Sequence, residues 1–375
     1  MRGMGLGLVA LVLAGGMSFP TAARAGEASD AEPVSEAEKA ELLAAETPQQ
    51  KALRAELAAL AKAGQKIYCN SNFEGPQAIY AVGADGSGFA RVTPKDWPDN
   101  QEYPHVSPDG KTIAFSTKRK MSKEELLKLP CDPDYSPAEW RKGGGRLKGS
   151  TTWIMNVDGT EPKLIVMGGA PHWSRDGKYL SYCTDVRPNN RRFGLYDVGN
   201  RTEHVFDVGK QPGTTCLSAD GKYYVFGSFY VEVAEILGGA DKPGKHPHGG
   251  RGCNQEVAPD NKWIVHVLDY KDGSWLYRFP FEPGKKNKTS ALDLGWPRAS
   301  QNYFPEVSPD CKYLVYGHWE TASCGKDRYT TNAADLYVTR WPPDKVNVRI
   351  TWHGGTTQNP QWIAPPEAKK KAGAP

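Results

Sequence analysis

One short phrase recurs along this chain and limits its fold more than any other feature. Residues 102–117, EYPHVSPDGKTIAFST, combine a polar lead-in, a Ser-Pro-Asp-Gly turn and an alternating apolar strand. A near-copy, APHWSRDGKYLSYCT, occupies residues 170–184. Asp in such a turn, followed directly by Gly, suits a tight hairpin in which one residue has a positive φ. One copy predicts a hairpin, whereas several copies in register predict a repeat fold.

The turn occurs five times, and a sixth copy is divided between the two ends of the chain. The turn aspartates are Asp109, Asp176, Asp220, Asp260 and Asp310. Residues 359–365, NPQWIAP, carry the lead-in, and residues 65–71, QKIYCNS, carry the strand that follows a turn. Joined, they complete one unit, as in a ring that the last strand closes to remove unpaired edges. We therefore predict an all-β fold, a six-bladed β-propeller with about four strands per unit and ring closure by the C-terminal strand.

Composition agrees with this fold. The 375 residues include 40 Gly, 29 Pro and 10% aromatic residues, which favours short strands joined by turns. We assign residues 65–365 to the propeller and expect residues 366–375 to form a disordered tail.

Residues 26–64 precede the propeller and carry signals for a short helical segment. Ser35 and Glu38 form a capping-box pattern, and Thr47 is followed by Pro at the first helical position. The apolar face of the second helix is formed by Leu53, Leu57 and Leu60. We expect this segment to pack on the propeller or to stand out as a solvated stalk, with a docking helix for a partner as the alternative.

The first 25 residues match a secretory signal peptide. They contain Arg2, an apolar run and the small-residue sequence AARA that ends at Ala25. We predict cleavage after Ala25, a periplasmic or secreted location and no transmembrane segment in the mature chain, because the apolar run is too short to span a bilayer. Loss of two Arg lowers the formal net charge from +4 to +2, which argues against nucleic acid as a partner. The pairing of the seven cysteines is left open.

The repeated phrase, with IYAVGADGSGFARVT between copies, resembles the repeat of TolB-like propellers and covers residues 65–365. The resemblance implies a propeller fold and leaves the chemistry open, since such propellers serve as protein-docking platforms, as appendages of peptidases and as lyase bodies. After removal of the predicted signal peptide only about forty residues precede the first repeat, and no G-x-S-x-G motif is present. The sequence therefore favours a free-standing propeller that is neither TolB itself nor a peptidase.

Equivalent positions of a propeller lie close together around its axis, so the lead-in strands predict a central ring. Its members are His105, His172, Cys216, Glu256, Glu306 and Gln361. Imidazole and carboxylate groups suit a divalent ion such as Mn²⁺, Ca²⁺ or Zn²⁺, and we take His105, His172, Glu256 and Glu306 as its candidate ligands. The alternative is a wet polar channel whose side chains bond water and neighbouring backbone.

Three longer stretches interrupt the repeats and are expected to be irregular loops on one face. They are Lys118–Ser150, which contains the basic sequence RKGGGRLKG, Ser228–Arg251 and His318–Ala334. Long loops in a compact repeat fold are usually functional or disordered. The candidate ligand contacts on the second and third stretches are His246, His248, Arg251, His318, Trp319, Lys326, Arg328 and Tyr329. Cationic and aromatic side chains suit an acidic ligand, although a solvated loop accounts for each residue by itself.

Two functions follow from these patterns. The first is an exported propeller that binds an envelope protein or an acidic polysaccharide on its loop-rich face. The second is a metal-dependent lyase or hydrolase of uronate polysaccharides, resembling oligogalacturonate lyase. In that case His105 or His172 would be the base, and Arg251 or Arg328 would neutralise the substrate carboxylate. We favour binding, because only the His before the Trp-Ser turn resembles the ligand pattern of that lyase family.

Overall fold

The computed structural model describes residues 33–97, 99–117, 150–183, 192–207, 214–227, 230–235, 245–270, 273–285, 287–297, 300–319 and 334–365. The described chain is mostly β, with two helices at its N-terminal end. The helices are α1 (Glu36–Ala44) and α2 (Pro48–Lys62). None of the described helices is long and apolar enough to cross a membrane.

The strands form six groups of four, which we call units 1 to 6. Unit 1 contains β24 (Thr357–Ile363), β1 (Lys66–Ser71), β2 (Ala78–Gly83) and β3 (Ala90–Arg91). Unit 2 contains β4 (Gln101–Val106), β5 (Thr112–Thr117), β6 (Thr151–Asn156) and β7 (Lys163–Met167). Unit 3 contains β8 (Gly169–Trp173), β9 (Tyr179–Cys183), β10 (Arg192–Asp197) and β11 (Thr202–Asp207).

Unit 4 contains β12 (Thr214–Leu217), β13 (Tyr223–Gly227), β14 (Tyr230–Glu235) and β15 (Lys245–Arg251). Unit 5 contains β16 (Cys253–Val257), β17 (Trp263–Tyr270), β18 (Gly273–Pro280) and β19 (Ser290–Ala291). Unit 6 contains β20 (Gln301–Val307), β21 (Tyr313–Trp319), β22 (Asp335–Arg340) and β23 (Val348–Arg349). Successive strands within each unit pair antiparallel, and units 5 and 6 are also joined by one parallel pairing, between Ser274 and Gln301.

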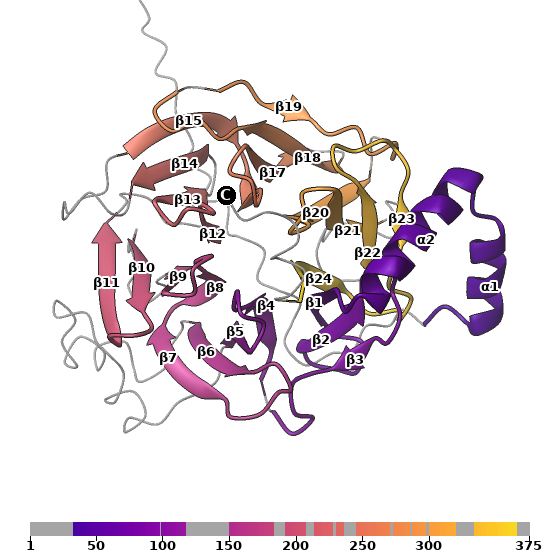
Figure 1. Cartoon of the computed structure of the whole chain (residues 1–375), viewed down its shortest axis with the longest axis horizontal. Helices are drawn as coiled ribbons and strands as arrows, with labels where there is room; N and C mark the ends of the chain where they lie inside the picture. The colour runs from indigo at the N-terminus through magenta and orange to yellow at the C-terminus, as the bar shows by residue number, and fades with distance from the viewer. Residues whose placement is uncertain are drawn as a thin grey trace, which may run out of the picture.

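The units are arranged around a common centre. Figure 1 shows the first strands, such as β4, β8 and β12, nearest this centre and β7, β11 and β15 at the rim. The C-terminal strand β24 pairs antiparallel with β1 and also contacts β4 and β20. The two ends of the described chain therefore meet in one sheet.

The repeated phrase recurs because it builds one and the same turn. In unit 2, the Ser107 hydroxyl donates to Asp109 Oδ1 over 2.6 Å, and the Lys111 N–H donates to the same oxygen over 3.1 Å. Gly110 has φ +73° and its N–H donates to the Ser107 carbonyl. The same Ser–Asp contact, 2.5–2.7 Å long, is present in units 3, 4 and 6.

The hydrophobic core is divided into clusters that lie between neighbouring units. Tyr68 and Ile79 of unit 1, for example, pack against Phe115 and Trp153 of unit 2. A comparable cluster joins Trp362 of unit 1 to unit 6. Because sheets bury their apolar faces against one another, side chains of two units are needed to complete each cluster.

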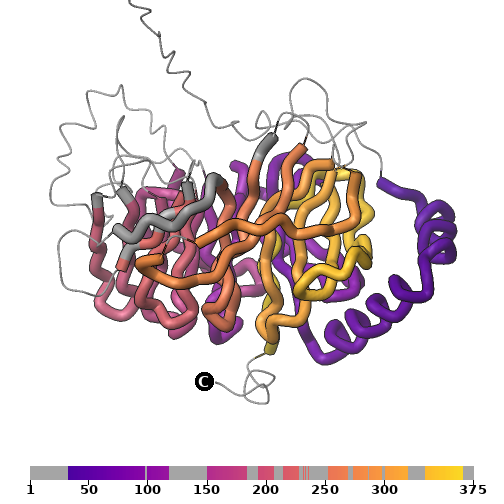
Figure 2. The backbone as a smooth tube through the Cα atoms, turned by 90° about the horizontal axis from the view of Figure 1, so that it is seen from above, coloured from indigo at the N-terminus to yellow at the C-terminus, as the bar shows by residue number. Residues whose placement is uncertain are grey.

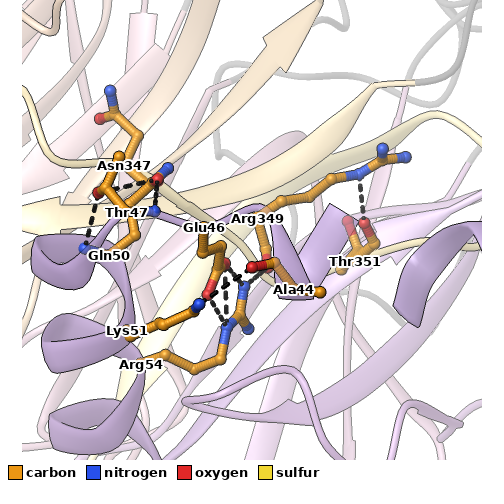
Figure 3. A network of polar contacts seen from close by, with 9 residues as sticks. All are labelled: Ala44, Glu46, Thr47, Gln50, Lys51, Arg54, Asn347, Arg349 and Thr351. Atoms are coloured by element: carbon orange, nitrogen blue, oxygen red, sulfur yellow. Dashed lines mark hydrogen bonds and ion pairs between the residues drawn. The ribbon is translucent and has the colours of Figure 1, made fainter. Parts of the chain in front are cut away.

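Helix α2 packs on units 1 and 6. Leu53 and Leu57 are fully buried in the cluster between these units. Figure 2 shows both helices at one edge of the layer of sheets, and Figure 3 shows the polar contacts beside them. The Arg54 guanidinium is paired with Glu46 and donates to the Arg349 carbonyl over 3.2 Å, and the Gln50 amide donates to the Asn347 carbonyl over 2.9 Å. Helix α2 is therefore packed on the sheets, whereas α1 has no buried residue.

The predicted irregular loop Ser228–Arg251 is wrong in part, because it contains two strands. Residues 230–235 form β14 and residues 245–251 form the outermost strand of unit 4, β15. The alternation of Val231 and Val233, both buried, supplies the strand pattern. Pro247 is compatible with an outermost strand, where a ladder hydrogen bond can be missing.

Candidate functional site

The first strands bring six equivalent residues to the centre of the fold. They are His105 on β4, His172 on β8, Cys216 on β12, Glu256 on β16, Glu306 on β20 and Gln361 on β24. We call this set the central ring. Each of these strands contacts the first strand of the next unit, from β24 through β4, β8, β12 and β16 to β20. Strand β20 in turn contacts β24. The ring positions that the sequence predicts therefore lie on strands that are spatial neighbours.

A β-bulge precedes the ring residue in five of the six strands. The register shifts just before His105, His172, Glu256 and Glu306, and within the part of β24 that carries Gln361. The residues two positions earlier all have φ near +50°: Tyr103, Ala170, Asn254, Phe304 and Asn359. A bulge re-aims the side chains that follow it. Only β12, which carries Cys216, pairs without a register shift.

Ring side chains hydrogen-bond the backbone of the next unit. The Val106 N–H of unit 2 donates to Gln361 Oε1 of unit 1, and the Trp173 N–H of unit 3 donates to His105 Nδ1 of unit 2 over 3.2 Å. At two further junctions the backbone of the next unit acts on a ring side chain: Val257 lowers the pKa of Cys216 and Trp362 lowers that of Glu306, each against a larger effect of burial. These interactions link units 1 and 2, 2 and 3, 4 and 5, and 6 and 1 through a polar side chain and the backbone of the next unit. Much of the central ring thus serves to hold neighbouring sheets together.

The pattern breaks at unit 3, next to the strand without a bulge. Neither ring nitrogen of His172 has a hydrogen-bond partner among the described residues. Its Nε2 lies 3.4 Å from Glu256 Oε2, two units away, and its ring lies 3.8 Å from the His105 ring, centroid to centroid. The strand between the units of His172 and Glu256 is β12, which carries Cys216 and has no bulge. We attribute the missing hydrogen bond of His172 to this missing bulge.

Burial controls the charge of the ring. It holds the pKa of His105 well below the usual value, and the neighbouring His172 lowers it further. Burial likewise raises the pKa of Glu306 well above its usual value, with a further rise from the charge of Glu256. The pKa of the Cys216 thiol is also raised well above its usual value, first by burial and then by Glu256. His105 is therefore neutral, and Glu306 tends to keep its proton.

A metal at the central ring stays a prediction, which the described residues do not support. No group of three or more His, Cys, Asp or Glu side chains among them is arranged to hold a metal ion. His105 illustrates the reason, because its Nδ1 accepts both the Trp173 N–H and the Gln361 amide, the latter over 3.0 Å. The lone pair that a metal would need is thus occupied, and the neutral ring carries its proton on the other nitrogen.

The structure also corrects the placement of two predicted ligand contacts. His318 and Trp319 end strand β21 and are 3% and 8% exposed, so they do not stand on an open loop. His318 Nδ1 lies 2.9 Å from Asn302 Oδ1, and its ring stacks on Trp296 at 3.9 Å. Burial lowers the pKa of His318 to about 4. Both residues belong to the packing between units 5 and 6.

The remaining predicted contacts are placed only in part. The backbone of His246, His248 and Arg251 lies on β15, at the rim of unit 4. Lys326, Arg328 and Tyr329 fall outside the described residues, as does most of the basic stretch Lys118–Ser150. Ligand binding by these side chains stays a prediction.

A hollow between units 1 and 2 was missed at the level of sequence. It has a volume of about 430 Å³ and is lined by residues of β1, β2 and β3 and by Val157 and Asp158 of unit 2. The signal was present in the repeats, because unit 1 carries Ala81 and Gly83 where the other units carry larger residues.

Comparison with solved structures decides the fold. TolB from Acinetobacter baumannii has a TM-score of 0.57 and 16% identity over 80% of this chain, which spans 66% of that TolB. A TolB-like protein from Agrobacterium tumefaciens has a TM-score of 0.50 and 13% identity. The match covers 80% of this chain and 98% of the Agrobacterium chain. The fold is that of TolB-like β-propellers.

Another β neighbour extends the range of proteins with this fold. A chain of the nidogen/laminin complex has a TM-score of 0.50 and 9% identity, covering 80% of this chain and 99% of its own. No family model and no curated protein matches the sequence. At these low identities the TolB-like likeness is one of fold alone.

Proposed function

We propose that the chain is a six-bladed TolB-like β-propeller closed by its C-terminal strand. The support comes from β24, which pairs with β1 and contacts β20, and from the apolar cluster that joins units 6 and 1. Each unit corresponds to one blade. Residues 1–25 act as a signal peptide cleaved after Ala25, and the mature chain, with its segment 26–64 and its propeller 65–365, works in the periplasm or outside the cell.

The propeller is a binding or scaffold protein for an envelope protein or an acidic glycan. The observation that carries this proposal is the use of the central ring: Gln361 and His105 accept backbone N–H groups of the next unit. Side chains used in this way give rigidity, which a docking platform needs. The nidogen/laminin complex is a complex of proteins by its own description, and it supports a protein partner.

The binding face is the one from which the connections between second and third strands leave. In unit 2 this connection contains the basic sequence RKGGGRLKG. The corresponding connection of unit 6 contains Lys326, Arg328 and Tyr329. To test it, residues 141–149 are replaced by a neutral Gly-Ser linker of equal length. Binding to polygalacturonate and to a detergent extract of the envelope is then compared with the unchanged protein by pull-down and cross-linking.

Loss of a specific partner, or of polysaccharide binding, in the linker variant supports the proposal. Equal retention of both ligands by the variant and the unchanged chain counts against this face. A Lys111→Met variant is the matched control, because Lys111 is exposed and lies in a turn at the opposite end of β5.

A lyase acting on acidic polysaccharides is the second candidate. The specific observation in its favour is the pair His172 and Glu256, whose Nε2 and Oε2 atoms lie 3.4 Å apart, and His172 would be the base. Arg251 or Arg328 would neutralise the substrate carboxylate. Incubation with oligogalacturonate, followed by the ultraviolet absorbance of unsaturated uronates, tests this function. Product formation that is lost in His172→Gln would favour the lyase over the pure binding protein.

A further inference from the structure

At the hollow between units 1 and 2, the paired strands of unit 1 carry smaller side chains than the other five units carry at the equivalent places. Tyr68 pairs with Ala81 across β1 and β2, and Lys66 pairs with Gly83. The residues that occupy the place of Ala81 in units 2 to 6 are Ile154, Leu195, Val233, Arg278 and Val338. Those in the place of Gly83 are Asn156, Asp197, Glu235, Pro280 and Arg340. Unit 1 alone has two small residues here.

Strand β1, the second strand of unit 1, also departs from the repeat at Lys66, the residue that pairs with Gly83. Lys66 takes the place of Thr112, Tyr179, Tyr223, Trp263 and Tyr313 in the other units. In unit 5 this place is filled by the Trp263 ring with the Arg278 guanidinium 4.3 Å above it. In unit 1, the aromatic ring and the large partner are both replaced, and a volume of about 430 Å³ is left open. A space of this size is typical of small-molecule sites.

Six of the fourteen residues that line the hollow are polar: Gln65, Lys66, Tyr68, Ser87, Arg91 and Asp158. The Arg91 guanidinium already donates to the Thr93 and Pro94 carbonyls and lies 3.6 Å from the Glu74 carboxylate, so the charges that a ligand would meet are those of Lys66 and Asp158. Lys66 lies on β1, and Asp158 lies in the turn after β6, on the facing unit. Hydrogen bonds from the Thr160 hydroxyl and N–H lower the pKa of Asp158, so its carboxyl is ionised. The lining also contains small apolar residues, Ala81, Ala90, Val92 and Val157 among them, beside these polar groups.

Tyr68 adds a hydroxyl to this lining. The residue is 7% exposed, and its ring packs in the cluster between units 1 and 2. Its hydroxyl makes no hydrogen bond to a described residue and is not among the fully enclosed polar atoms without a partner. A nearly buried phenol whose polar tip reaches a hollow can bond a ligand placed there.

We propose that this hollow binds a small zwitterion, an aliphatic α-amino acid. The ligand carboxylate is paired with Lys66, the ammonium group with Asp158, and the aliphatic side chain lies against Val92 and Val157. The site goes beyond the proposed function, since it opens beside the β2–β3 turn, away from the predicted loop face.

The test is calorimetry with L-leucine and the full chain, alongside two analogues that each lack one charge. We expect saturable binding of L-leucine and at least about tenfold weaker binding of 4-methylpentanoate and of 3-methylbutylamine, since each loses one ion pair. Saturation by either analogue as tight as that by L-leucine overturns the zwitterion assignment. Absence of binding by folded protein overturns the site.

Variants locate the ligand. Ala81→Leu restores the residue of unit 3 at this place and is expected to abolish binding while circular dichroism stays unchanged. Lys66→Met, on an exposed side chain, is expected to weaken L-leucine about tenfold or more and to leave 3-methylbutylamine unaffected. Lys111→Met, in the equivalent region of unit 2, is the control and should bind as the unchanged protein does. Wild-type affinity in Lys66→Met contradicts the proposal even if Ala81→Leu fails to fold.

Discussion

The backbone N–H of Trp173 donates a hydrogen bond to Nδ1 of His105 over 3.2 Å, and this bond joins the first strands of two neighbouring units. The same nitrogen accepts the amide of Gln361 from a third unit over 3.0 Å. Because burial and His172 hold the pKa of His105 well below its usual value, the ring stays neutral and keeps this lone pair. One imidazole therefore serves as acceptor for units on both sides of it.

Removal of this acceptor should destabilise the protein. His105→Leu leaves the Trp173 N–H without its partner, and we expect a loss of about 2 kcal/mol in the free energy of unfolding. Urea denaturation followed by tryptophan fluorescence measures the change. His204→Leu, at an exposed position of β11, is the control and should alter the stability by less than about 0.5 kcal/mol. Equal stability of both variants would mean that the shared acceptor contributes nothing.

Acid should destabilise the fold through its buried imidazoles. His266 is fully buried, and burial lowers its pKa to about 4. Since an unfolded His titrates near 6.5, the unfolded chain binds more protons below that pH. The contribution of His266 is therefore complete above pH 6.5 and is lost as the pH falls towards 4, by roughly 3 kcal/mol in total. His318 and His353, with pKa values also lowered to about 4, act in the same direction.

The pH dependence can be assigned with one substitution. Burial raises the pKa of Asp335 to about 6, so this group has the opposite sign and stabilises the fold as the pH falls through 6. His266→Gln removes one titrating imidazole and leaves Asp335 unchanged. We expect a shallower fall in unfolding free energy between pH 6.5 and 4 than in the unchanged protein, measured by urea denaturation at several pH values. Parallel curves would refute the role of His266.

The turns of the repeats allow a matched test of backbone strain. Gly221 has φ +69°, and a Cβ added to it would meet no atom within 4 Å. Cys311 takes the equivalent place in unit 6 with φ +56° and already has a Cβ. Gly221→Ala should cost about 1 kcal/mol, because left-handed backbone is unfavourable for residues other than glycine. Cys311→Ala should change the stability by less than about 0.5 kcal/mol, and equal losses at both sites would disprove this account.

Helix α2 should contribute to stability through its buried leucines. Leu57 has no exposed surface and packs in the cluster between units 1 and 6. Leu57→Ala is expected to cost about 2–5 kcal/mol, the range for truncation of a core leucine. Leu42→Ala is the control on α1, since Leu42 is 44% exposed, and its effect should stay below about 0.5 kcal/mol. Thermal and urea unfolding of the two variants would distinguish a packed helix from a loosely attached one.

Local features of this fold could be predicted from the sequence, because they depend on residues close together in the chain. Ser107, Asp109 and Gly110 satisfy one another within a single turn. The position of the ring residues follows, since each precedes such a turn by the same number of residues. The side-chain contacts of His105 could not be predicted in the same way, because its partners are backbone and amide groups of other units.

Features that depend on distant packing were missed for the same reason. His318 follows a glycine and precedes a polar stretch, so the sequence suggests a loop, yet Trp296 and Asn302 of other segments enclose it. The outermost strand of unit 4, β15, was hidden by Pro247, which is compatible with a strand at the rim because a ladder hydrogen bond can be missing there. The hollow beside Ala81 became visible only when the paired strands fixed which residues are equivalent.

The C-terminal strand offers the strongest test of ring closure. Residues of β24 pair with β1, and Trp362 is 2% exposed, with its indole N–H donating to Gln65 Oε1 over 2.8 Å. Deletion of residues 357–375 removes this strand and exposes apolar surface of units 1 and 6. We expect the truncated chain to lose its single cooperative thermal transition, whereas deletion of residues 366–375 alone should leave the transition unchanged. Cooperative melting of the longer truncation at the original temperature would show that closure by β24 does not hold the propeller together.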